Sequence, residues 1–391
     1  MPNKFSEFPL KTNDSPLLSI LLFQVPVFLT LGSLIRPPEH NYLPATDIFE
    51  FTFFFSALLF SGKQSNRLQL IVISLMLWVT IRIVVAWQIA PVGEIFRAHK
   101  WLLYLIALCF FVGSNIKERN YVIQFSKFLI SVMTAKYVVI VVFFGLNSRP
   151  GVFTENNFEL FFAIGLFAVV YKEISKFRTL FLWLLIACVS ISGSRSAVIG
   201  LIVLIFYVVL TSKNKNTFIK YIYLVLTVAS LYLPFFVFSI RNTTLENLDR
   251  LKFFNSFLIE IQSWDIWSWL IGNPPITPLS IDTCNRLAFY ESLLSSAHDG
   301  SCYSVIFHSF FLRVIFDFGL FGLVVAVTAL FVIMSLGRIN KPLKYTLLLL
   351  SIVNGISVSG QNNVYVILPI AYALMTAKKE LSADGSEFED A

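Results

Sequence analysis

The sequence has little charge for its length. Only 14% of its 391 residues are charged, whereas 57% are hydrophobic and the mean hydropathy is +0.75; a soluble domain carries about 25% charged residues. A compact soluble fold of this size needs a polar surface that so few charged residues do not supply. Soluble, disordered and fibrous classes are thereby excluded. Cysteine is scarce too, with four residues, so the chain is not a disulfide-dense scaffold.

Motifs for several common kinds of enzymatic chemistry are also missing. A Walker A loop needs a Lys after its glycines, but Gln361 follows Gly360. The absence of an Asp-x-Asp pair disfavours a metal-held nucleotide-sugar site, and the absence of GxSxG and HExxH disfavours serine-hydrolase and zincin chemistry. The four His residues are scattered, so we expect no metal site and no cofactor. Any reaction must therefore use a substrate that is already activated.

Long apolar runs occupy most of the chain. A helix needs about 20 mostly apolar residues to cross the hydrocarbon core of a membrane. We therefore predict an all-α, polytopic integral membrane protein with about 12 transmembrane helices. The predicted spans are 17–35, 43–61, 68–89, 101–115, 122–146, 158–171, 179–193, 197–212, 219–239, 309–336, 345–359 and 363–377.

The basic residues are unevenly divided between the two sides of this topology. With both termini in the cytoplasm, 17 of the 30 Lys and Arg residues lie on the cytoplasmic side and five lie in the short outer loops. Basic residues resist translocation, so this bias predicts that both termini are cytoplasmic. The net charge of +7 follows from this topology signal rather than from a basic patch. We therefore do not expect nucleic acid as a partner.

One segment without a predicted span divides the chain. It must lie on the outer side, between the ninth and tenth spans, and a long loop in a compact protein is usually functional. The predicted regions are nine spans within 1–240, the large outer loop 241–307, three spans within 308–379 and a disordered acidic cytoplasmic tail at 380–391.

The large outer loop mixes both signs of charge with Trp residues. Its stretches 251–258 and 261–271 can form helices that lie along the membrane interface. Cys284 and Cys302 both lie in this loop. Two readings stay open for them, a disulfide in an oxidising periplasm or two unrelated thiols.

Ionisable residues inside predicted spans, or at their outer ends, are the first candidate binding residues. Arg82 lies within a span, about two turns from its outer end. A charge there either has a functional role or reaches the interface along its aliphatic stem. The segment 149–157 brings Arg149 and Glu155 to the start of the sixth span. Glu155 is there either a binding residue or a helix cap.

Residues 192–196, with the sequence Ser-Gly-Ser-Arg-Ser, join two spans by a tight outer turn. An Arg in such a hairpin runs against the charge bias of the other loops. Backbone N–H groups at a helix start bind anions, and Arg adds forked recognition of phosphate. We therefore predict that Ser194 and Arg195 bind a phosphate group.

The long loop re-enters the membrane at His308. His is the side chain best suited to proton transfer near neutral pH, although a His at a helix start is also a common cap or interface residue. Arg313 and Asp317 are four residues apart and should share one helix face. His308 faces elsewhere unless the helix begins after it.

Taken in order, these motifs resemble the bacterial O-antigen polymerase and O-antigen ligase superfamily. The resemblance rests on the turn at 192–196, the long outer loop, and the pattern His-Ser-x-x-Leu-x-x-x-x-Asp-x-Gly-x-x-Gly that begins at His308. The segment 149–157 is similar to the Gly-x-Phe-x-Glu-Pro of the polymerases, with Asn156 in place of Pro. Asp317 stands where that family more often has Glu.

The resemblance implies a GT-C-like glycosyltransferase that inverts the sugar linkage at the periplasmic face of the bacterial inner membrane, without ATP or metal. Its substrate would be an oligosaccharide linked to undecaprenyl diphosphate and embedded among membrane lipids, and a chain-length regulator protein is a further candidate partner. Arg195 would hold the donor diphosphate, with Arg149, Arg313 and Arg82 completing a cationic site. His308 would orient or deprotonate the acceptor hydroxyl.

Three functions remain in competition. We expect a polymerase that joins lipid-linked repeat units of O-antigen or a related surface polysaccharide. An O-antigen ligase, which transfers the glycan to lipid A–core, shares the fold, the donor and the motifs. A lipid-linked oligosaccharide flippase belongs to another class, whose signature is repeats with helices broken near the midplane. Polar residues gathered at one face of the membrane favour an enzyme.

Overall fold

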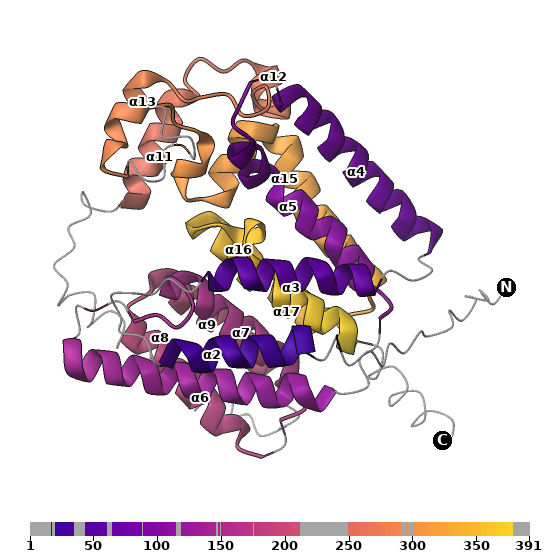
Figure 1. Cartoon of the computed structure of the whole chain (residues 1–391), viewed down its shortest axis with the longest axis vertical. Helices are drawn as coiled ribbons and strands as arrows, with labels where there is room; N and C mark the ends of the chain where they lie inside the picture. The colour runs from indigo at the N-terminus through magenta and orange to yellow at the C-terminus, as the bar shows by residue number, and fades with distance from the viewer. Residues whose placement is uncertain are drawn as a thin grey trace.

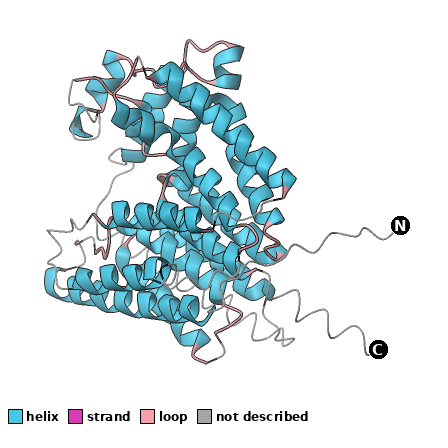
Figure 2. Ribbon diagram, turned by 45° about the vertical axis from the view of Figure 1, so that its right-hand side comes forward, coloured by secondary structure: helices cyan, strands magenta, loops and turns pink. Residues whose placement is uncertain are grey.

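The computed structural model describes residues 17, 20–34, 44–60, 65–87, 89–114, 119–145, 148, 150–174, 176–211, 249–290, 295 and 300–377. Within these ranges every regular element is a helix, as Figure 2 shows, which confirms the all-α class. The elements are η1 (Ile20–Gln24), α2 (Val25–Leu34), α3 (Ala45–Leu59), α4 (Asn66–Ala86), α5 (Val92–Phe111), α6 (Arg119–Phe144), α7 (Asn156–Val170), α8 (Arg178–Ser192), α9 (Arg195–Thr211), α11 (Asp249–Glu260), α12 (Ile266–Ile271), α13 (Ile281–Arg286), η4 (Ala288–Tyr290), η5 (Ser304–Phe307), α15 (Phe310–Leu336), α16 (Lys341–Ser357), η6 (Gly360–Asn362) and α17 (Val364–Thr376).

Among the described residues, three helices are long and apolar enough to cross a membrane, namely α4, α6 and α15. Several other apolar helices, α7, α8, α9 and α17 among them, have 17 residues or fewer. All predicted spans except 219–239 overlap described helices, although their bounds differ, as for α5 (Val92–Phe111) against the predicted 101–115. That stretch, the beginning of the outer loop at 241–248 and the predicted tail at 380–391 lie outside the described residues.

Local sequence explains where several helices begin and end. The side chains of Ser65, Asn340 and Asn363 accept hydrogen bonds from the first turns of α4, α16 and α17. Such caps satisfy N–H groups that have no partner within the helix. Gly193 takes a left-handed conformation at φ 63°. It ends α8 and lets α9 begin two residues later.

Helices α7 and α17 form the centre of the bundle. Their side chains are buried over almost the whole length of both helices. They pack closely at Gly165, where a Cβ atom would lie 2.9 Å from the side chain of Pro369. By contrast, α4 lies on the outside of the bundle (Figure 1) and exposes Leu70, Leu77 and Val84. An apolar helix with an exposed apolar side is typical of a surface that faces lipid.

The described parts of the outer loop pack with the first half of α15 at one end of the bundle (Figure 1). Helices α11 and α12 fall on the two stretches that were predicted to form interfacial helices. Phe253, Phe257 and Phe307 pack together in an apolar cluster. A disulfide joins Cys284 in α13 to Cys302, with 5.8 Å between the Cα atoms. Of the two open readings of these cysteines, the structure shows the bridge.

Candidate functional site

The ends of several helices meet at one side of the bundle, and several of the predicted residues lie at or next to these ends. Helices α7, α9, α15 and α17 begin there, and α8 and α16 end there. This arrangement agrees with spans that alternate in direction, so that alternate ends face the same side. The polar groups of these ends form the candidate site.

Buried hydroxyl groups hold the turn between α8 and α9. Ser194 Oγ donates a hydrogen bond to Asn157 Oδ1 at 2.6 Å and lies 3.3 Å from Ser196 Oγ. The Ala197 N–H donates to Ser194 Oγ at 3.3 Å. Arg195 is the first residue of α9 and is half-buried. The hydroxyl of Ser194 therefore shapes the turn, whereas Arg195 keeps contact with the surface at the N-terminus of a helix.

Glu159 organises the segment that leads into α7, although the sequence analysis did not select it. Its carboxylate accepts hydrogen bonds from the N–H groups of Val152 at 2.8 Å, Phe153 at 2.7 Å and Thr154 at 3.3 Å. The hydroxyl of Tyr137 in α6 donates to it at 2.5 Å. Glu159 is completely buried. An acidic residue within an otherwise apolar helix was the sequence signal that could have identified it.

Glu155 occupies the N-cap position of α7, at the start of the sixth predicted span. It stands just before α7 but is exposed, and its side chain does not cap the helix. Instead, Asn156 donates from Nδ2 to the carbonyl of Ser192 at 3.0 Å and so ties α7 to the neighbouring turn. Arg149 lies outside the described residues. The capping interpretation of Glu155 is therefore wrong, and its binding role stays a prediction.

Arg82, Arg313 and Asp317 come together at the first part of α15. The Arg82 guanidinium donates to the main-chain carbonyl of Asp317 and lies 4.4 Å from the centre of the Phe318 ring. Asp317 Oδ2 accepts a hydrogen bond from Ser304 at 2.6 Å, and the charges of both arginines act on this buried carboxylate. Arg313 and Asp317 are both buried in α15, and Arg82 from α4 adds a second positive charge near the same carboxylate.

The helix break at Gly319 explains why main-chain carbonyls are available there. Gly319 has φ 67° within α15, so the helix is kinked at this residue. The carbonyl of Phe316 accepts from the N–H of Asn273 at 2.9 Å, and that of Asp317 accepts from Arg82. Carbonyl groups near such a break need partners outside the helix. The kink therefore connects the outer loop and α4 to the candidate site.

Hydrogen bonds at the end of α16 connect the turn at 192–196 with the start of α15. Asn354 Nδ2 lies 3.5 Å from the main-chain carbonyl of Asn157. The side chain of Asn157 accepts a hydrogen bond from Ser194 in the segment 192–196. Ser309 Oγ donates to the carbonyl of Gly355 at 3.1 Å. The end of α16 therefore lies between the turn at 192–196 and the start of α15.

His308 precedes α15 and does not belong to it. The helix begins at Phe310 with Ser309 as its cap, so His308 is free of the helix-face constraint. Its backbone has φ 53°, a left-handed conformation that is uncommon for residues with a side chain, although His adopts it more readily than most. The half-buried ring lies 5.2 Å from the ring of Phe253 in α11.

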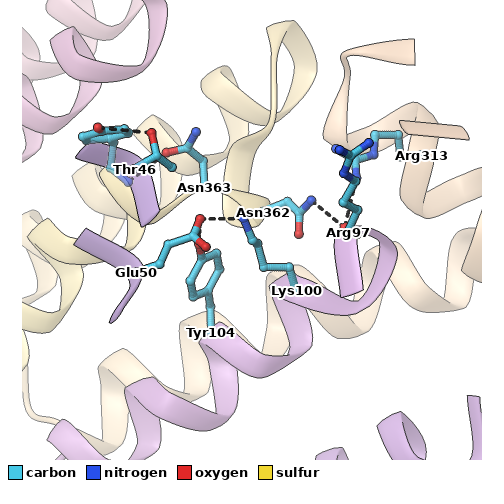
Figure 3. Close-up of polar contacts among 9 residues, drawn as sticks. Thr46, Glu50, Arg97, Lys100, Tyr104, Arg313, Asn362 and Asn363 are labelled. Carbon is cyan, nitrogen blue, oxygen red and sulfur yellow. Dashed lines mark hydrogen bonds and ion pairs between the residues drawn. The ribbon is translucent and has the colours of Figure 1, made fainter. Parts of the chain in front are cut away.

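A further polar region that the sequence analysis did not identify lies beside this site (Figure 3). Glu50 in α3 accepts a hydrogen bond from Lys100 in α5 at 2.5 Å. Asn362 donates from Nδ2 to the carbonyl of Arg97 at 3.0 Å, and Arg313 donates to the same carbonyl at 3.1 Å. Polar groups therefore continue from the kinked helix α15 to the first turns of α3.

The candidate residues combine positive charge with the half-buried imidazole of His308. Arg195 stands at the start of α9, whereas Arg82 and Arg313 lie near Asp317 in α15. Within the described ranges, no three His, Cys, Asp or Glu side chains are placed to hold a metal ion. Such a site is suited to binding an anion and moving a proton. No family model matches the chain, and no curated protein or solved structure matches it significantly.

Proposed function

We propose that the chain is an O-antigen polymerase. It would join repeat units of O-antigen, or of a related surface polysaccharide, that are linked to undecaprenyl diphosphate. A twelve-span, GT-C-like architecture in the bacterial inner membrane, with cytoplasmic termini, belongs to this proposal. One structural observation supports it most directly. The turn at 192–196 is linked through Asn157 to the end of α16, and Ser309, beside His308, donates a hydrogen bond to the same end.

The donor half of the reaction needs a cationic site. Arg195, with Arg149, would bind the diphosphate through paired N–H donors and neutralise its charge. The acceptor oxygen forms a bond to the anomeric carbon while the bond from that carbon to the diphosphate oxygen breaks. The electron pair leaves with undecaprenyl diphosphate, and the configuration inverts. Fixed guanidinium groups stabilise the developing charge without reorganisation.

The acceptor half needs a positioned base. His308 would accept the proton of the attacking hydroxyl, a contribution of about 10²–10⁴-fold in rate for a general base. Its place just outside α15, with Phe253 beside it, supports this role because the ring is held but remains half-exposed. Arg82, Arg313 and Asp317 would fix the kinked start of α15 on which His308 depends.

The proposal is tested in a strain that lacks the gene, complemented with wild type, Arg195→Ala or His308→Ala. The readout is the lipopolysaccharide pattern on a gel. We expect core with a single repeat and no ladder for both variants. Arg286→Ala is the matched control, because Arg286 is an exposed outer-loop residue whose ion pair with Asp282 has no part in the site. It should retain the ladder, and blots must show equal amounts of each protein in the membrane.

Other outcomes distinguish the competing functions. Bare core with accumulation of lipid-linked polymer would identify a ligase. Lipid flipping by the purified protein in vesicles, without a glycan product, would identify a transporter. A full ladder from His308→Ala would remove the acceptor role, and one from Arg195→Ala would remove the diphosphate role.

A further inference from the structure

Helix α12 in the outer loop is strongly apolar, and yet its side chains are exposed. Its sequence is Ile-Trp-Ser-Trp-Leu-Ile, and none of its side chains is buried. Ile266 is 70% exposed, Trp267 65% and Ile271 58%. An exposed apolar surface of this kind marks a site of contact with another molecule or with a membrane. Trp is enriched where a membrane meets water.

The helix is fixed in place at its C-terminal end. Gly272 and Gly319 face one another across the contact between α12 and α15. A Cβ atom on Gly319 would lie 2.3 Å from the carbonyl oxygen of Leu270, and one on Gly272 would lie 2.5 Å from the backbone nitrogen of Phe318. The backbones therefore pack directly against each other, and the N–H of Asn273 donates to the carbonyl of Phe316. Helix α12 is thus held rigidly on the kink.

The other end of α12 is capped by a charged group. Asp265 Oδ1 accepts a hydrogen bond from the N–H of Ser268 at 2.8 Å. This bond stabilises the carboxylate and lowers the pKa of Asp265. The cap is fully exposed, so one end of the helix has a charge that must stay in water. The exposed apolar side chains and the charged cap together describe a helix that lies along an interface rather than one that crosses it.

The outer end of α4 reaches the same kink. Arg82, in the last two turns of α4, donates to the carbonyl of Asp317. Figure 1 shows α12 beside this end of α4. Helix α4 is one of the three candidate spans, and its exposed apolar side continues through Ile81 and Val84 to Trp87. The apolar surface of α12 therefore begins where the lipid-facing surface of α4 ends.

We propose that α12 inserts its apolar side chains into the outer leaflet of the membrane, at the level of the lipid headgroups, and anchors the outer loop there. The occupant of this surface is lipid. Through Gly272 and Gly319, the anchor fixes the level of the kink in α15, and so of Arg82 and Asp317, relative to the bilayer. The inference depends on α4 lying in a membrane and not on glycosyl transfer.

The test measures where position 267 lies relative to the bilayer. A nitroxide label is placed at Trp267→Cys in full-length protein with Cys109→Ser and Cys188→Ser, so that the disulfide is kept. The protein is reconstituted into vesicles of phosphatidylethanolamine and phosphatidylglycerol. Collisions of the label with oxygen, which concentrates in lipid, are compared with collisions with a water-soluble nickel complex. Val84→Cys is the lipid control and Asp282→Cys the water control.

We expect the oxygen-to-nickel collision ratio at position 267 to be severalfold higher than at 282 and close to that at 84. A ratio at 267 equal to that at 282 would overturn the proposal. Shielding of 267 from both reagents would mean that protein, such as a second copy of the chain, covers α12 instead. A water-like ratio at 84 would also overturn it, because α4 would then not lie in lipid.

A second measurement needs no label. Brominated lipids quench the fluorescence of Trp residues that lie in the bilayer. Replacement of Trp267 by Phe should therefore reduce the quenched fraction relative to wild type. An unchanged fraction would contradict the insertion of Trp267 even if the labelled variant failed to fold.

Discussion

Glu159 should be the acidic residue on which the local fold depends most. Replacement by Ala removes the acceptor for the N–H groups of Val152 and Phe153, both of which are buried, and for the hydroxyl of Tyr137. A buried donor that loses its partner costs about 1–3 kcal/mol. The two backbone groups alone therefore predict a loss of about 2–6 kcal/mol in the free energy of unfolding.

The matched control for Glu159→Ala is Glu155→Ala. Glu155 lies one turn earlier and has the same side chain, but it is exposed and makes no cap hydrogen bond. Thermal unfolding in detergent, followed by size-exclusion chromatography, should give a lower Tm for Glu159→Ala and an unchanged Tm for Glu155→Ala. Glu159→Gln should lie between them, because the amide keeps one acceptor oxygen but turns an NH₂ group toward N–H donors.

Equal Tm values for Glu159→Ala and wild type would refute this reasoning. Such a result would mean that Val152 and Phe153 find other acceptors when the carboxylate is removed. A lower Tm in both variants would mean that truncation of a Glu side chain near the start of α7, rather than loss of the hydrogen bonds of Glu159, is responsible.

Two further predictions concern the outer loop. Replacement of both Cys284 and Cys302 by Ser removes a crosslink between residues that are 18 positions apart. The loss should destabilise the loop by about 3 kcal/mol. Limited proteolysis should then cleave the loop of the variant faster than that of wild type, and equal cleavage rates would contradict the prediction. Gly319→Ala places a Cβ atom against α12 at φ 67°, which adds backbone strain of about 1–3 kcal/mol to a steric clash. Gly319→Ala should therefore speed hydrogen exchange in α12. Gly113→Ala is the control, because Gly113 has φ 82° but no atom lies within 4 Å of its Cβ position, so the substitution adds strain without a clash. Similar exchange rates in α12 for the two variants would exclude a role for the contact between Gly319 and α12.

The helices were predictable because their cause is local. An apolar run long enough to cross a membrane must pair its backbone groups within itself, and a helix does this without any partner segment. The loop helix α11 follows from apolar residues interleaved with charge, whereas α12 is a short apolar run that follows Asp265. The number of membrane crossings was less accessible, because helices such as α7 and α17 are shorter than a bilayer requires and are buried by their neighbours.

The candidate site was predictable only in part. The turn at 192–196 and the start of α15 stood out because charge and Gly are conspicuous in an apolar sequence. The roles of Glu159 and Asn354 were missed because each depends on partners from other helices or turns. The kink at Gly319 was missed because a Gly in a helical pattern does not show whether another backbone approaches it.

By itself the sequence determined the class of the protein, the positions of its helices and the residues from which a site can be made. Hydropathy and charge act over one helix length, so they can be read along the chain. Only the tertiary structure decided which of these residues meet. It places the end of α16 between two distant motifs, pairs Cys284 with Cys302 and sets α12 on the kink of α15. These contacts depend on how whole helices pack, and no single segment encodes that packing.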